Sequence, residues 1–188
     1  MGNEYFSIST QPLTQLDDEV SFEQGENRVT IFSKTPFIKD KPTADSYTSV
    51  CAETVTAFGP LIIYGTIIGY LGGRTLHFKS DLEKQTLDLT HLSKQRNICF
   101  AGDLNISFAG TPYPSTMVVK NVAELFDNLG LTIITKDCED SAIHGMFSNT
   151  FLKNFEIKQD YMVFDKKITD HRLVTITLTP KDVRILVI

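Results

Sequence analysis

The chain has 188 residues, of which 41% are hydrophobic and 22% are charged. This length and composition predict one folded domain with a sizeable core and exclude an intrinsically disordered chain. The net charge of −5 argues against broad, non-specific affinity for nucleic acid, which needs a basic face. It leaves open a phosphate substrate that a divalent cation bridges.

The three cysteines, Cys51, Cys99 and Cys138, lie far apart and form no CxxC pair. This spacing predicts reduced, buried thiols rather than a disulfide framework or a zinc site. No N-terminal apolar run resembles a signal peptide, and no stretch of about 18 apolar residues is present to span a membrane. We therefore expect a cytoplasmic protein with no membrane span.

The first part of the chain is expected to be irregular and then rich in strands. Alternating runs of β-forming residues predict strands, and Phe58-Gly59-Pro60 predicts a tight turn between two of them. The expected elements are an irregular segment 1–27, a strand 28–33, a loop 34–46, and a hairpin of strands 49–57 and 61–70.

The rest of the chain is expected to alternate helices with short strands. Apolar residues at helical spacing predict two amphipathic helices, and Gly130 is a plausible stop for the second. The expected elements are a helix 76–92, a strand 97–101, a helix 118–129, and strands 131–135, 154–164 and 173–178.

The order of these elements predicts an α+β fold. Two mainly antiparallel sheets would pack face to face, with helices outside them, as a four-layer sandwich. A doubly wound parallel sheet is the weaker alternative, because the turn at Gly59-Pro60 joins two strands too closely for a parallel crossover.

Two short segments carry residues suited to chemistry. In Gly102-Asp103-Leu104-Asn105, the acid and the amide follow a buried strand at positions i and i+2, which share one face. In Thr169-Asp170-His171, a carboxylate directly precedes an imidazole and can orient it. Each segment alone is weak evidence, because an ordinary turn or loop explains it more simply.

Together the two segments resemble the endonuclease/exonuclease/phosphatase superfamily. Its members end one core strand in Gly-Asp-x-Asn and begin their last strand with Ser-Asp-His, which residues 102–105 and 169–171 match. The strand from Arg28 to Pro36 and the following segment 58–66 also resemble family strands, in the same order. The resemblance covers roughly residues 28 to 178.

The resemblance implies metal-dependent hydrolysis of phosphodiesters or phosphomonoesters with Mg²⁺ or Mn²⁺. Asp103 would orient the attacking water and bind metal, and Asn105 would contact the scissile phosphate. His171 would act as the general acid/base, and Asp170 would pair with a histidine or complete the metal site. His144 matches the histidine of a further catalytic Asp-His pair.

The chain departs from the family pattern in three places. Family members begin with a strand ending in Asn, a helix, and a strand ending in a metal-binding Glu, but residues 1–27 are not apolar enough for two core strands. We therefore expect an N-terminally incomplete domain over residues 28–188. In addition, Ile67 follows Thr66 where many relatives have His, and Ile143 stands where an Asp should precede His144.

These departures leave three hypotheses. The first is an active phosphoesterase acting on a phosphate ester, such as a nucleic acid or nucleotide. The second is a catalytically inactive, truncated relative that acts as a binding module. Its uncovered sheet surfaces would favour a homodimer. The third is an ordinary α/β domain in which both motifs occur by chance, and it predicts that Asp103 and His171 lie far apart.

Overall fold

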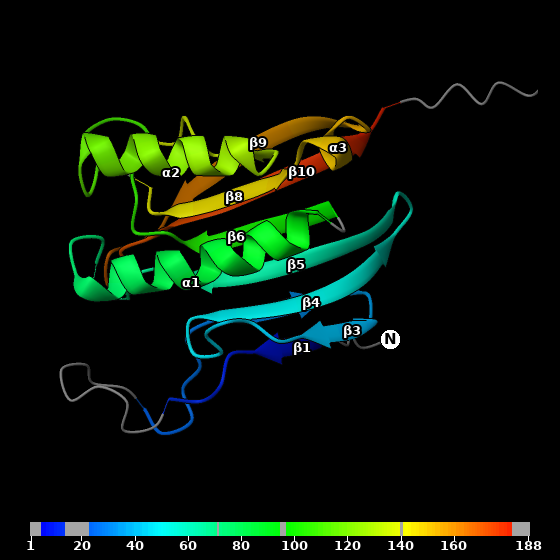
Figure 1. Ribbon diagram of the computed structural model, residues 1–188, viewed down its shortest axis with the longest axis horizontal. Helices are drawn as coiled ribbons and strands as arrows, with labels where there is room; N and C mark the ends of the chain where they lie inside the picture. The colour runs from blue at the N-terminus through cyan, green and yellow to red at the C-terminus, as the bar shows by residue number, and fades with distance from the viewer. Residues whose placement is uncertain (1–4, 14–22, 71, 95–96, 140, 182–188) are drawn as a thin grey trace, which may run out of the picture.

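The computed structural model describes residues 5–13, 23–70, 72–94, 97–139 and 141–181. Ten strands and three helices are assigned within them (Figure 1). In chain order they are β1 (Phe6–Ser9), β2 (Thr30–Ser33), β3 (Lys39–Lys41), β4 (Ser49–Thr56), β5 (Gly59–Ile67), α1 (Leu76–Ser93), β6 (Asn97–Asp103), α2 (Thr116–Asn128), β7 (Leu131–Ile133), β8 (Ile143–Ser148), α3 (Asn149–Leu152), β9 (Phe155–Val163) and β10 (Arg172–Pro180). No helix among the described residues is long and apolar enough to cross a membrane.

A central sheet of six strands has the order β3-β4-β5-β6-β8-β7. The β4–β5 hairpin is antiparallel, as the turn signal predicts, and Gly59 adopts a φ of +98° at that turn. Strands β5 and β6 are parallel, and α1 supplies the long crossover that such a pair requires. This crossover brings the ends of β5 and β6 to the same edge of the sheet.

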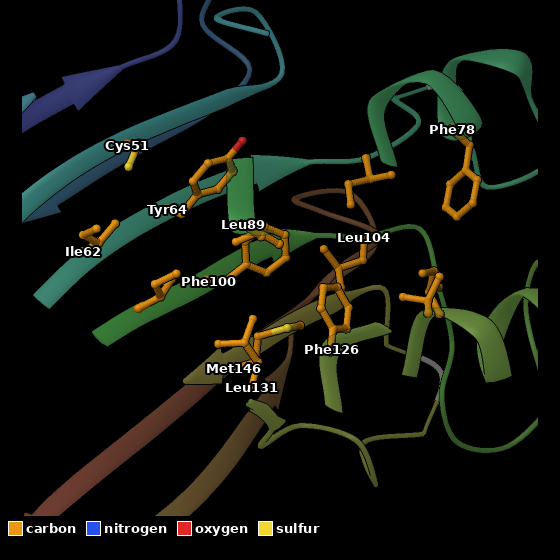
Figure 2. Packing of buried hydrophobic residues seen from close by; sticks show 14 residues of the cluster. Cys51, Ile62, Tyr64, Phe78, Leu89, Phe100, Leu104, Phe126, Leu131 and Met146 are labelled. Carbon is orange, nitrogen blue, oxygen red and sulfur yellow. The ribbon is translucent and has the colours of Figure 1, made fainter. Parts of the chain in front are cut away.

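The helices α1 and α2 cover one face of the central sheet (Figure 1). Both begin at a hydroxyl cap: the Thr75 side chain accepts from the Phe78 amide, and the Ser115 side chain accepts from the Val118 amide. Beneath them lies the main core (Figure 2), to which α1, α2 and the strands all contribute. Its largest fully buried side chains include Tyr64, Phe100 and Phe126.

Two separate hairpins cover parts of the opposite face. Strand β2 approaches β5 at Gly65, where a Cβ would lie 3.1 Å from Ile31 Cγ1. Strand β10 approaches β8 at Gly145, where a Cβ would lie 2.5 Å from Ile176 Cδ1. Each hairpin therefore packs on the sheet where a glycine leaves room for an isoleucine.

The α+β class and the packing of sheets face to face are confirmed. The outer layer differs from the expectation, because it consists of two antiparallel pairs, β1–β2 and β9–β10, rather than one continuous sheet. Both long helices lie on a single face, so the described residues form three layers: helices, central sheet and hairpins.

Four elements were not expected from the sequence. Strand β1 lies within residues 1–27, and β3 lies within the expected loop 34–46. Strand β8 was missed because both of its faces are covered, so that its residues do not alternate between apolar and polar. The helix α3 has a single turn and is too short for a periodic signal.

Candidate active site

The two motifs meet at one edge of the central sheet. His171 Nε2 lies 3.5 Å from Asp103 Oδ2 and 3.6 Å from Asp170 Oδ1. Asp103 ends β6, and His171 directly precedes β10, so the outer hairpin delivers the imidazole to the end of the central strand. The hypothesis that the motifs occur by chance predicted a large separation, and this distance argues against it.

Asp103 is held in a largely desolvated position. Its side chain is 14% exposed, and its Oδ1 accepts a 2.8 Å hydrogen bond from the Asn105 backbone amide. Burial raises the pKa of the Asp103 carboxyl, and the Asn105 amide and His171 offset part of that rise. The nearby Asp170 carboxylate raises the same pKa further. The second oxygen of Asp103 is left facing His171.

His171 and Asp170 lie on the solvent side of the site. The His171 side chain is 42% exposed and the Asp170 side chain 85%. Thr169 Oγ1 accepts from the His171 amide at 3.1 Å, which orders the turn before β10. The imidazole therefore lies between one desolvated and one hydrated carboxylate, with solvent access for a substrate.

Asn105 is tied to the loop that follows β5. Its Nδ2 donates to the carbonyl oxygens of Ile68 and Gly69, both at 3.0 Å. Its backbone has a φ of +49°, a conformation that asparagine tolerates better than most residues. Both amide hydrogens are used in this way, so in this structure Asn105 positions the loop rather than pointing a free donor at a substrate.

His144 is placed in the core rather than at the site. It is 0% exposed, and Nε2 donates to the Ile106 carbonyl at 2.9 Å. Nδ1 must then accept from the Thr135 hydroxyl at 2.8 Å, and burial lowers the pKa of the imidazole. His144 pairs with Gly102, whereas Asp103 pairs with Ile143, so His144 and Asp103 face opposite sides of the sheet. This position does not support a catalytic role.

The position of His144 leads to a prediction about stability. His144→Ala should reduce the free energy of unfolding by about 2 kcal/mol or more, because it leaves the Thr135 hydroxyl without its acceptor and the Ile106 carbonyl without its imidazole donor. Thermal melting measures the loss, and activity per folded molecule should stay the same. Unchanged melting with lost activity would instead indicate a catalytic histidine.

Two buried polar side chains of α1 also hold the loop that follows β5. Asp81 Oδ2 accepts from the Gly69 amide at 2.9 Å, and Gln85 Nε2 donates to the Ile67 carbonyl at 3.3 Å. Gln85 also accepts from the Thr66 hydroxyl. The sequence carried a signal for this pair, because Asp81 and Gln85 are polar residues one turn apart on the buried side of the helix.

Asp81 gives the fold a pH dependence. Burial raises its pKa, so the carboxyl's contribution to stability is fully present at low pH and is lost as the pH rises through that raised pKa. Asp81→Asn keeps an acceptor for the Gly69 amide and removes the charge. The variant should therefore melt higher than the native protein near neutral pH, and its advantage should vanish near pH ~4. A difference in melting temperature that does not change with pH would contradict this account.

An aromatic and cationic rim surrounds the loops at this edge. The Arg28 guanidinium lies 3.5 Å from the centroid of the Tyr70 ring, and His77 packs on the same ring at 4.8 Å. Arg74 lies 5.2 Å from the Tyr113 ring, whose hydroxyl accepts from the Gly73 amide at 3.1 Å. The sequence gave no signal that these cations would gather there.

Solved structures of known proteins share this architecture, although no match by sequence was found. No family model and no curated protein matches the chain. Among solved structures, an endonuclease/exonuclease/phosphatase from Beutenbergia cavernae aligns over 94% of this chain and 53% of its own, with 13% identity and a TM-score of 0.62. The chain thus spans about half the length of that protein.

Two further solved structures align similarly. The endonuclease domain of TRAS1, a telomere-specific non-LTR retrotransposon, aligns over 93% of this chain and 80% of its own, with 12% identity and a TM-score of 0.64. The human Nocturnin catalytic domain aligns over 93% and 72%, with 12% identity and a TM-score of 0.61. The chain has the fold of the endonuclease/exonuclease/phosphatase proteins, as its motifs indicated.

Proposed function

We propose that the chain is a hydrolase of phosphate esters that uses Mg²⁺ or Mn²⁺. The observation that carries the proposal is the 3.5 Å approach of His171 Nε2 to Asp103 Oδ2, at the end of a core strand in this fold. A desolvated carboxylate beside a solvent-accessible imidazole is suited to activating a water and moving a proton.

The carboxylates present suit a partly hydrated magnesium ion. Magnesium in phosphoryl-transfer sites is commonly held by one or two carboxylates together with waters and substrate oxygens. Asp103 and Asp170 would supply these carboxylates, with His171 between them. A bound Mg²⁺ would neutralise charge that develops on the phosphoryl oxygens.

The side chains of the site would then divide the remaining work. Asp103 would orient and polarise the attacking water through its Oδ2. His171 would donate to a phosphoryl or leaving-group oxygen, and Asp170 would stabilise the imidazolium form. Asn105 would hold the loop after β5 in place through the Ile68 and Gly69 carbonyls.

The rim supports a nucleotide or nucleic acid as the substrate. Arg28 and Arg74 lie against the Tyr70 and Tyr113 rings of the loops next to Asn105, in a chain of net charge −5. Arginine side chains are suited to contacting the phosphate groups of such a substrate. The TRAS1 neighbour is an endonuclease domain, which agrees with this substrate class.

The assay that tests the proposal uses His171→Ala. The native chain should hydrolyse bis-p-nitrophenyl phosphate and a short oligonucleotide only when Mg²⁺ or Mn²⁺ is present. Loss of the imidazole should lower kcat/KM by about 10²–10⁴-fold, the usual effect of removing a general acid/base. His91→Ala, in the last turn of α1, is the control and should keep full activity. Equal activity of both variants would refute the role of His171.

A second candidate function is a binding module without catalysis. In the part of the chain that the structure describes, no group of three or more His, Cys, Asp or Glu residues is arranged to hold a metal ion. A protein without turnover, and without a thermal shift on adding Mg²⁺ or Mn²⁺, would favour this candidate.

A further inference from the structure

The buried side of α1 carries polar residues among its apolar ones. Its buried residues are Phe78, Asp81, Gln85 and Leu89, and Asp81 is only 4% exposed. A buried carboxylate is unfavourable unless it makes hydrogen bonds, because burial removes its hydration. The reason for an acid at this position must therefore lie in the group that it contacts.

Asp81 contacts the loop between β5 and α1. Its Oδ2 accepts from the Gly69 amide at 2.9 Å, although the two residues are 12 positions apart. Gly69 lies tightly against the helix, since an added Cβ would be 2.8 Å from Phe78 Cβ. Its φ of +67° also disfavours any other residue. The helix thus fixes the position of this peptide group from one side.

Asn105 holds the same peptide group from the other side. The Ile68 carbonyl and the Gly69 amide belong to one peptide bond, which is planar and rigid. Asn105 Nδ2 donates to the Ile68 carbonyl at 3.0 Å. Hydrogen bonds on both sides of a peptide group polarise it, and in a buried setting they strengthen one another. Asp81 and Asn105 are therefore coupled through a single rigid unit.

From this peptide group, hydrogen bonds continue to Asp103. The Asn105 amide donates to Asp103 Oδ1 at 2.8 Å, and the Ile68 amide donates to the Asp103 carbonyl at 2.8 Å. Asn105 has a φ of +49°, which is unfavourable for a residue with a side chain. Its hydrogen bonds to the loop stabilise this conformation, and the conformation directs the Asn105 amide toward the Asp103 carboxylate.

We propose that Asp81 is a positioning residue of the candidate active site. It holds the peptide group at Gly69, and this group holds Asn105 in the conformation that orients the Asp103 carboxylate. The second oxygen of that carboxylate is the one that lies 3.5 Å from His171 Nε2. The effect of Asp81 on turnover rests on the proposed function, whereas its effect on Asn105 does not.

Kinetics of the full chain at saturating Mg²⁺ test this positioning role. Asp81→Ala should lower kcat by about 10–100-fold, the usual effect of removing an outer partner of a metal-site side chain. KM should hardly change, because Asp81 acts through Asn105 rather than on the substrate. Asp81→Asn keeps an oxygen that accepts from the Gly69 amide and should restore most of the activity. Val122→Ala, at a buried position of α2, is the matched control: it destabilises the core but should keep the kcat of the folded chain.

A double-mutant cycle tests whether Asp81 acts through Asn105. Asn105→Ala alone should slow turnover, because it removes the link between the loop and the Asp103 turn. Adding Asp81→Ala to that variant should then slow it by no more than about twofold further. Two residues that act independently would instead give a loss equal to the product of the single losses.

Hydrogen exchange of the Asn105 backbone amide provides a readout that needs no turnover. This amide donates to Asp103 Oδ1, and in Asp81→Ala it should exchange at least about tenfold faster. Rates are taken relative to amides of the β4–β5 hairpin, so that a general loss of stability cancels. Asp81→Asn and Val122→Ala should keep the native relative rate. If Asp81→Ala does not fold, Asp81→Leu removes the acceptor while filling the space and takes its place in every experiment.

Three outcomes would overturn the proposal. One is a native kcat in Asp81→Ala, and another is a loss in the double variant equal to the product of the single losses. The third is an unchanged relative exchange rate at the Asn105 amide. A native chain without turnover would refute the proposed function instead, and the exchange rate alone would then decide whether Asp81 positions Asn105.

Discussion

Asp103→Asn should reduce metal-dependent hydrolysis of bis-p-nitrophenyl phosphate by about 10²–10⁴-fold, the range expected when a positioned acid/base is removed. The substitution keeps the size of the side chain and the acceptor for the Asn105 amide. It removes the charge that would bind metal and polarise water. The loss should therefore appear in kcat/KM without a loss of folded protein, which thermal melting verifies.

Asp170→Asn is the comparison for this result. The Asp170 carboxylate is 85% exposed and the Asp103 carboxylate 14%, so only Asp103 acts in a desolvated setting. Charge is worth more where water is excluded, and the loss at Asp170 should be clearly smaller. Full activity of Asp103→Asn, or a larger loss at Asp170, would show that the site is assembled differently.

Gly102→Ala should destabilise the fold by about 3–5 kcal/mol, the range of the most damaging single substitutions. A Cβ at Gly102 would lie 1.8 Å from the Thr66 carbonyl oxygen, and the backbone φ of +152° disfavours any side chain. Thr66 and Gly102 are paired in the parallel β5–β6 ladder, so neither strand can move away without breaking it. We expect a fall in melting temperature of about 10 °C.

Gly130→Ala separates the two causes of that loss. Gly130 follows α2 with a φ of +69°, and nothing lies within 4 Å of an added Cβ. Its replacement should cost only the conformational term of about 1–2 kcal/mol. Comparable melting of the two variants would mean that the close approach of β6 to β5 at Gly102 is relaxed in solution.

The amino-acid pattern was sufficient for the elements with a long run of β-forming residues or a clear helical spacing. The helix over Leu76–Ser93 has helical spacing, and the strands β4, β5 and β10 are rich in β-forming residues. The expected bounds of all four agree with the structure within a few residues. Strand β8 was not predicted, because His144 and Gly145 interrupt the run of apolar residues in this short segment. Its position depends on contacts with Ile106 and Ile176, which are far away in sequence.

The site was predictable only in part, because its residues come together from distant parts of the sequence. Asp103 and His171 could be placed together because the resemblance supplied a long-range relation that no local pattern contains. His144 matched that resemblance equally well, yet its side chain faces the opposite side of the sheet. The bracing of the loop by Asp81, and the gathering of cations at the rim, are tertiary features. Only the polar positions on the buried side of α1 hinted at the first of these.

The measurement that tests the central claim most directly is the hydrolysis of bis-p-nitrophenyl phosphate by the unmodified chain during a titration with Mg²⁺ and then Mn²⁺. Our account predicts no turnover without metal, saturable turnover with it, and a parallel rise in melting temperature. A chain that binds neither ion and shows no turnover at any concentration would contradict the assignment of Asp103 and His171 as a working hydrolytic site.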